Sequence, residues 1–139
     1  ECGDLVATID MLPSIAALTG SHLPTDRKID GLDMSHKLLG SADKPDRHEY
    51  LYYTSQGAIE GLRQGKWKLL VKSPGQKRNQ TDEQVAEPTI LLFDLLADVG
   101  EQSNLAAEHP DVVKQLTARM RELDAEITAG AREAWFKKD

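Results

Sequence analysis

The side chains whose types could most readily do chemistry are three acidic residues at the end of the apolar segment 89–95 and shortly after it. Asp94, Asp98 and Glu101 lie close together in the chain, and carboxylate oxygens are the ligands that calcium and magnesium prefer. Their spacing lacks the alternating oxygen ligands and central glycine of a calcium loop. Aspartate also caps turns by accepting hydrogen bonds from backbone N–H groups. We therefore expect turn capping here, and local backbone hydrogen bonds from Asn104.

The histidines supply no recognisable catalytic set. His109 precedes Pro110, which predicts a residue at a helix entry rather than one that transfers protons. His22, His36 and His48 lie in expected loops or at the start of a strand. No Ser-His-Asp arrangement is indicated, so we expect no catalytic, cofactor-binding or metal-binding residue in this chain.

The Lys66-Trp67-Lys68 segment could form a platform on which bases or sugars stack. Three tyrosines precede it in the sequence: Tyr50, Tyr52 and Tyr53. The formal net charge of −6, from 17 Lys and Arg against 23 Asp and Glu, argues against nucleic acid as a partner. In a strand with one buried face, Trp67 shares its side with Leu69 and Val71, so the pattern favours core packing.

Arg63 is the candidate for an ion pair. It could pair with Asp30 or Asp33 and tie the loop that contains Asp30-Gly31, called the Asp-Gly loop below, to the sheet, because arginine forms strong two-point pairs with carboxylates. Contact with a substrate is the alternative role. Other conspicuous residues receive no functional role: the lone Cys2, the glycosylation sequon Asn79-Gln80-Thr81, and Trp135 and Phe136 near the end, which we expect to fray or to face a partner.

The elements that position these residues begin with a helix expected over residues 4–19, with Asp4 as a cap. Pro13 lies inside this pattern, so either the helix kinks there or a second helix begins with Pro13. Both sides of the helix are apolar. One side carries Leu5, Ile9 and Leu12, and the other carries Val6, Met11, Ile15 and Leu18. A helix that is apolar nearly all round is typical of the interior of a larger body.

The rest of the chain predicts an α+β fold. Residues 22–46 read as loop with one helical turn, and four strands follow near residues 48–55, 58–63, 66–72 and 89–95. Gly65 is expected to supply a positive φ in the turn between the second and third strands. Apolar residues at helical spacing predict a long helix over 110–128. A four-stranded antiparallel sheet covered by this helix is the simplest architecture.

Four sequence blocks between residues 10 and 106 point to a family. They are Asp10-Met11-Leu12-Pro13-Ser14, Leu23-Pro24 with the run to Asp33, Arg63 to Leu69, and Leu92-Phe93-Asp94-Leu95 with the run to Ala106. In this order they resemble the closing segments of sulfatases of the arylsulfatase and N-acetylgalactosamine-6-sulfatase type, in the alkaline phosphatase superfamily. Three positions depart from the family pattern: Ser14 replaces threonine, Phe93 replaces tyrosine and Val99 replaces proline.

The resemblance implies a parent enzyme that hydrolyses sulfate esters with a formylglycine nucleophile and calcium, and that is secreted or periplasmic. The family's nucleophile motif, C/S-x-P-S-R, is missing, since Cys2-Gly3-Asp4-Leu5 does not match it. The resemblance therefore predicts the end of a large α/β domain over residues 1–46 and a C-terminal subdomain over 47–139. We expect this fragment to be inactive alone, to support the missing N-terminal catalytic domain, and to offer loops for one wall of the substrate pocket.

Two other interpretations stay open. The chain could be a free-standing sheet-and-helix interaction module, or the tail of a related phosphoric or phosphonic ester hydrolase. No run of 18 apolar residues is present, so we expect no membrane partner. Severed from a large domain, the chain would expose the apolar surface around Val6, Ile15 and Leu18. We therefore expect that it self-associates, or that about its first 20 residues are mobile while residues 48–128 stay folded.

Overall fold

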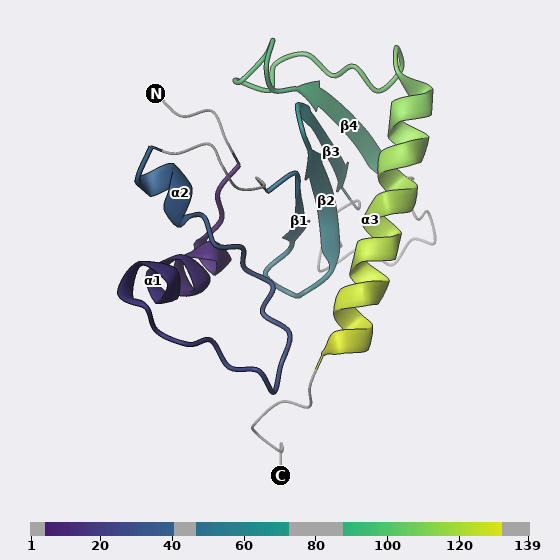
Figure 1. The fold of residues 1–139 in the computed structure, drawn as a ribbon. Coiled ribbons are helices and arrows are strands. Elements are labelled where there is room, and N and C mark those ends of the chain that lie inside the picture. The colour runs from purple at the N-terminus through teal and green to yellow at the C-terminus, as the bar shows by residue number, and fades with distance from the viewer. Residues whose placement is uncertain (1–4, 41–46, 73–87, 132–139) are drawn as a thin grey trace. The chain divides into compact units, whose positions relative to one another are not determined.

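The computed structural model describes residues 5–40, 47–72 and 88–131. The chain divides into two compact units, residues 1–50 and 51–139. Figure 1 shows short helices in the first unit, and a sheet with one long helix in the second. No helix in the described ranges has the length and apolar character needed to span a membrane.

The first unit contains a 3₁₀ turn, η1 (Thr8–Asp10), followed by the helices α1 (Met11–Thr19) and α2 (Ser35–Leu38). The predicted helix start is wrong over residues 5–7, because Ala7 is extended (φ −120°, ψ 157°). Asp4, the expected cap, lies outside the described residues. Pro13 is the third residue of α1 rather than its first, and α1 tolerates it there because the first N–H groups of a helix have no partner inside the helix.

The buried side of α1 carries small residues: Pro13, Ser14 and Ala16. The Asp-Gly loop packs against this region closely. A Cβ atom at Gly31 would fall well inside contact distance of the Ile9 carbonyl oxygen and 3.0 Å from Pro13 Cγ. Glycine is therefore required at this position for steric reasons.

Four strands form the sheet: β1 (Glu49–Tyr53), β2 (Ile59–Gln64), β3 (Trp67–Lys72) and β4 (Thr89–Asp94). Their order is β1-β2-β3-β4, and β3 pairs antiparallel with β2 and with β4. Gln64 lies opposite Trp67 across a tight turn in which Gly65 has a φ of 56°. The predicted sheet and its glycine turn are confirmed, with strand ends that differ by one or two residues.

The core of the second unit lies between this sheet and α3 (Pro110–Gly130). The register places Leu62 opposite Leu69, and Leu69 opposite Leu92, so one leucine from each of three strands lies in a row. The row is fully buried and meets Leu116 and Met120 of α3. The predicted covering helix is confirmed, and it continues two residues beyond the expected end at 128.

Candidate functional site

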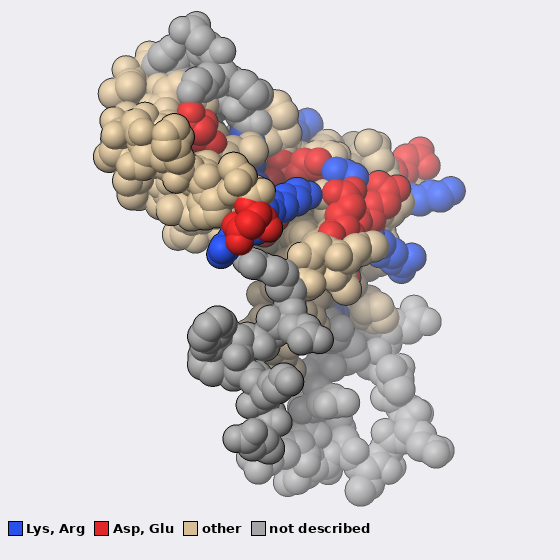
Figure 2. Space-filling view, turned by 60° about the horizontal axis from the view of Figure 1, so that its bottom comes forward, with Lys and Arg blue, Asp and Glu red and all other residues tan. Residues whose placement is uncertain are grey.

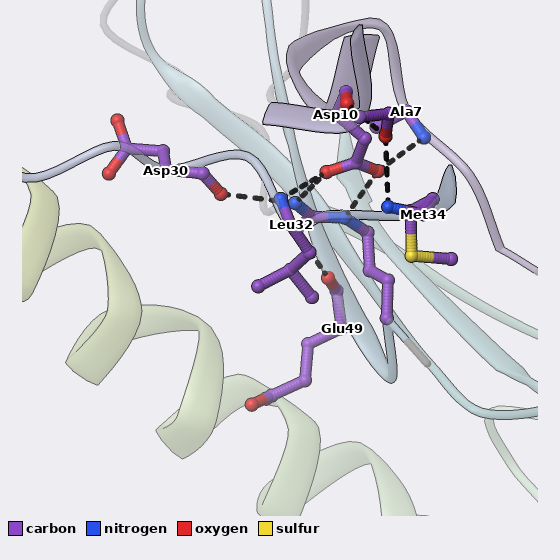
Figure 3. A network of polar contacts seen from close by, with 8 residues as sticks. Ala7, Asp10, Asp30, Leu32, Met34 and Glu49 are labelled. Atoms are coloured by element: carbon purple, nitrogen blue, oxygen red, sulfur yellow. Dashed lines mark hydrogen bonds and ion pairs between the residues drawn. The ribbon is translucent and has the colours of Figure 1, made fainter. Parts of the chain in front are cut away.

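Asp10 is the centre of a buried polar network in the first unit (Figure 3). Its Oδ1 atom accepts a hydrogen bond from the Leu32 N–H (2.8 Å), and its Oδ2 atom accepts one from the Ala7 N–H (2.8 Å). Arg47 adds a two-point ion pair: Nε donates to Oδ2 at 3.0 Å, and Nη2 donates to Oδ1. The residue is only 1% exposed. Both carboxylate oxygens are thus held by N–H donors.

These donors decide the charge state of Asp10. Burial alone would raise the pKa of this carboxyl group, but the hydrogen bonds from Arg47, Leu32 and Ala7 outweigh burial and hold the pKa below its ordinary value. The group is therefore a carboxylate at neutral pH. Since its oxygens already accept four hydrogen bonds, it is suited to holding chain segments together and not to abstracting a proton.

Ser14 extends the network by one helical turn. Its Oγ atom donates to the Asp10 carbonyl oxygen at 2.6 Å and accepts from the Met34 N–H at 2.9 Å. Arg47 also donates to the carbonyl oxygens of Asp30 (3.0 Å) and Glu49 (3.4 Å). The network therefore joins the start of α1, the Asp-Gly loop and the beginning of β1.

Sequence reasoning missed the pairing of Asp10 with Arg47. One signal was present, because Asp10 is the only Asp, Glu, Lys or Arg residue between positions 5 and 25. A single charge in such a segment needs a partner when it is buried. The predicted arginine was Arg63, whose Nε donates to the Gly65 carbonyl oxygen at 3.3 Å. A pair between Arg63 and Asp30 or Asp33 would join the two units and stays a prediction.

Two of the acidic residues, one at the end of β4 and one after it, cap turns as predicted. Asp94 Oδ1 accepts from the Leu96 N–H at 3.1 Å, and Asp98 Oδ2 accepts from the N–H groups of Gln102 and Ser103 at 2.8 Å each. Such bonds stabilise irregular backbone without any cation. Within the described ranges no group of three or more His, Cys, Asp or Glu side chains is arranged to hold a metal.

Two lysines at and after the turn between β2 and β3 form ion pairs with acidic side chains. Lys66 Nζ lies 2.6 Å from Asp94 Oδ2, and this hydrogen bond lowers the pKa of Asp94. Lys68 Nζ lies 2.6 Å from Glu101 Oε1, so Glu101 forms an ion pair rather than the expected turn cap. Glu101 also has a φ of 54°, which is uncommon outside glycine. Figure 2 shows acidic and basic side chains interleaved over one part of the surface.

Asn104 hydrogen-bonds backbone groups as predicted, and its partners include the outer edge of β4. Its Oδ1 atom accepts from the N–H groups of Leu92 and Ala106 at 3.0 Å each, and its Nδ2 atom donates to the Ile90 carbonyl oxygen at 3.2 Å. The Leu105 N–H donates to the Leu92 carbonyl oxygen at 2.8 Å. These contacts occupy backbone groups that an edge strand would otherwise offer to another chain.

Trp67 and His109 take the predicted structural positions. Trp67 is half-buried and packs against the leucine core, which favours core packing over an exposed stacking platform. Its ring lies 5.2 Å from the ring of His109, and Lys66 Nζ lies 4.5 Å from its centroid. His109 is the N-cap residue of α3, directly before Pro110.

The other candidate residues do not gather at one place. His22 and His48 are exposed, whereas His36 is buried within α2. Tyr53 donates from its hydroxyl to Asp124 at 3.0 Å, and burial together with this bond raises the pKa of Tyr53 to about 12. The described residues do not include Cys2, the sequon Asn79-Gln80-Thr81, Trp135 or Phe136.

Comparisons with known proteins agree with the resemblance. Residues 46–136 match the family described as the C-terminal region of aryl-sulfatase. The chain is 34% identical to arylsulfatase A of Bos taurus over 148 residues, covering 91% of this chain and 29% of that protein. It is 32% identical to N-acetylgalactosamine-6-O-sulfatase of Bacteroides thetaiotaomicron, covering 81% of this chain and 22% of that protein. The chain thus spans less than a third of the length of either relative.

The solved structures show the same fold. The PsFucS1 sulfatase from Pseudoalteromonas superposes with a TM-score of 0.68 at 19% identity, covering 94% of this chain and 28% of that one. A Bacteroides thetaiotaomicron structure, titled for the metabolism of multiple glycosaminoglycans, superposes with a TM-score of 0.61 at 26% identity, covering 84% and 24%. The chain therefore belongs to the sulfatase family and contains its C-terminal region.

Proposed function

We propose that this chain is the non-catalytic C-terminal part of an enzyme that hydrolyses sulfate esters. One observation carries the proposal: polar side chains of the sulfatase-like blocks are engaged in holding the chain's own backbone. Five residues make such contacts: Asp10, Ser14, Asp94, Asp98 and Asn104. Carboxylates and hydroxyls used in this way support a structural role.

The chemistry of the parent enzyme would come from residues outside this chain. In sulfatases a formylglycine, made from the first residue of C/S-x-P-S-R, supplies the nucleophilic oxygen, and calcium binds the sulfate. That motif does not occur among the 139 residues. The carboxylate of Asp10 does not fit a calcium site, because backbone N–H groups and Arg47 already occupy its oxygens. No step of the reaction is therefore assigned to residues of this chain.

The role proposed here is to support a preceding catalytic domain of the same polypeptide and to offer loops for one wall of its substrate pocket. Sulfate esters are the substrate class that the names of the relatives support, and two of those names are arylsulfatase A and N-acetylgalactosamine-6-O-sulfatase. A secreted or periplasmic, calcium-dependent parent belongs to the same proposal.

An activity comparison tests the proposal. The 139-residue chain and the longest polypeptide that its gene encodes are assayed with 4-nitrophenyl sulfate, with and without added calcium. We expect turnover by the longer polypeptide alone, because a nucleophile and its metal ligands are needed for the reaction. Calcium-dependent turnover by the pure 139-residue chain would contradict the non-catalytic role.

A phosphate ester serves as the matched substrate. If the longer polypeptide hydrolyses 4-nitrophenyl phosphate and not 4-nitrophenyl sulfate, the parent enzyme is a phosphoric ester hydrolase instead. A gene that encodes no C/S-x-P-S-R segment ahead of residue 1 would count against the sulfatase parent directly.

A further inference from the structure

The connection between α1 and α2 carries two adjacent basic residues, Arg27 and Lys28. Figure 1 shows this stretch as a long connection without helix or strand. Every residue from 24 to 28 is exposed. Residues 22–29, which we call the basic loop, form no backbone–backbone hydrogen bond to a described residue. Exposed, irregular segments of this kind are preferred sites of proteolytic cleavage.

The ion pair of Arg27 lies within the basic loop. Its guanidinium pairs with the neighbouring residue Asp26, with Nε 2.9 Å from Oδ1 and Nη2 3.0 Å from Oδ2. The side chain of Arg27 is 42% exposed and that of Asp26 is 63% exposed. Exposed pairs contribute little to stability. Loss of this pair is therefore a small obstacle to a protease that binds the Arg27 side chain.

The chain is anchored on both sides of the basic loop. Before the loop, the Ser21 N–H donates to the Ala16 carbonyl oxygen at 2.9 Å, at the end of α1. After the loop, the Arg47 guanidinium donates to the Asp30 carbonyl oxygen at 3.0 Å. A protease must open a short stretch of chain before it can cleave. Here that opening is confined to the basic loop, because the anchors flank it.

Buried contacts join the segments that precede and follow the basic loop. Asp10 accepts the N–H of Leu32 and pairs at two points with Arg47 (Figure 3). Ser14 accepts the N–H of Met34 at 2.9 Å. Asp10 and Ser14 precede the loop and are buried, whereas their three partners follow it. Cleavage within the loop therefore leaves all of these contacts in place.

We propose that a protease specific for basic residues cleaves the folded protein after Arg27 or Lys28, and that the two parts stay assembled through the contacts of Asp10 and Ser14. The specificity pocket of such a protease holds a carboxylate that pairs with the basic side chain. Cleavage hydrolyses one peptide bond: water supplies a hydroxyl group to the carbonyl carbon and a proton to the amide nitrogen. The new carboxylate and ammonium groups form in an exposed segment, where water solvates both.

Limited digestion with trypsin tests the cleavage site. The longest polypeptide that the gene encodes is digested under native conditions, and mass spectrometry identifies each bond that is cut. Arg121, which is exposed on α3, is the internal reference. We expect cleavage after Arg27 or Lys28 to be at least about tenfold faster than after Arg121, because a helix must unfold locally before a protease can bind it. Equal or slower cleavage in the basic loop would overturn the proposal.

Size-exclusion chromatography of the cleaved protein tests whether the parts stay assembled. We expect them to elute together in native buffer and to separate in denaturing urea, because the contacts between them are buried and non-covalent. Separation in native buffer would contradict assembly.

Three variants of the longer polypeptide test which contacts hold the cleaved parts. Asp10→Asn is expected to make them separate at least about tenfold faster after dilution, because the Arg47 guanidinium loses its carboxylate. Ser14→Ala removes the acceptor for the Met34 N–H, and the same direction of change is expected should Asp10→Asn fail to fold. Asp26→Asn is the matched control at an exposed position and is expected to change nothing. Equal rates in all three variants would contradict the role of the buried contacts.

Discussion

The guanidinium of Arg47 pairs at two points with the carboxylate of Asp10, which lies 37 positions earlier in the chain. The Asp10 side chain is 1% exposed and that of Arg47 is 10% exposed, so the pair is withdrawn from water. A buried carboxylate that loses its cation keeps the cost of burial without the compensating attraction. Loss of either partner is thus expected to destabilise the first unit.

Replacing Arg47 with alanine is expected to lower the free energy of unfolding by about 3–5 kcal/mol, the usual cost of breaking a buried pair. Urea titration followed by circular dichroism measures this change. Arg27→Ala is the matched control, because the pair of Arg27 with Asp26 is largely exposed and such pairs contribute about 0–1 kcal/mol. An Arg47→Ala variant as stable as Arg27→Ala would show that the network does not hold the unit together.

The same pair predicts how stability depends on pH. The pKa of Asp10 is lower in the folded chain than the ordinary value of 3.8, so the unfolded state binds more protons at acidic pH. The stabilising contribution is complete above the unfolded pKa and is lost as the pH falls through the folded pKa.

Asp10→Asn is expected to flatten this acid dependence in thermal unfolding between about pH 6 and the acid limit of folding. The pKa of Asp94 is also lowered, by its bond to Lys66, so Asp94→Asn is the comparison variant. Because the side chain of Lys66 is more exposed than that of Arg47, the effect of Asp94→Asn should be the smaller one. An unchanged pH profile in Asp10→Asn would refute this account.

Trp67→Ala is expected to destabilise the second unit by about 3 kcal/mol, toward the lower end for buried aromatic residues, because Trp67 is half-buried. Leu96→Ala is the control, since Leu96 is 84% exposed and exposed positions change stability by less than about 0.5 kcal/mol. Chemical unfolding gives both values. A cost below about 0.5 kcal/mol for Trp67→Ala would revive the idea of an exposed stacking platform.

Asn104→Ala is expected to cost about 1–3 kcal/mol, because the Leu92 N–H and the Ile90 carbonyl oxygen lose their side-chain partner. The freed edge of β4 should also promote aggregation. Exchange of the Leu92 amide and light scattering measure the two effects.

Asn104→Asp is the matched control for that edge. It keeps an acceptor for the Leu92 N–H, whereas the donor to the Ile90 carbonyl oxygen is replaced by a negatively charged oxygen. We therefore expect protection of the Leu92 amide to survive in Asn104→Asp. Loss of protection in both variants, or in neither, would show that the side chain does not guard the edge.

Elements whose signals are local are predictable from the amino-acid sequence alone. Alternating residues in 66–72 predicted β3, and apolar residues at helical spacing predicted α3, because each pattern reflects burial of one side of one element. The position of Gly65 also follows from a local signal, because a two-residue turn requires a positive φ. The roles of Asp98 and His109 also depend on their nearest neighbours in the chain.

The start of the first helix and the choice of the arginine that neutralises Asp10 depend on tertiary contacts. The extended Ala7 donates its N–H to the Asp10 carboxylate, three residues later in the chain. Hydrogen bonds from Arg47 and Leu32 orient that carboxylate. Neither partner is near Asp10 in the sequence. A local pattern can report that a charge stands alone in an apolar segment, but the distant group that compensates for its burial is chosen by the path of the folded chain.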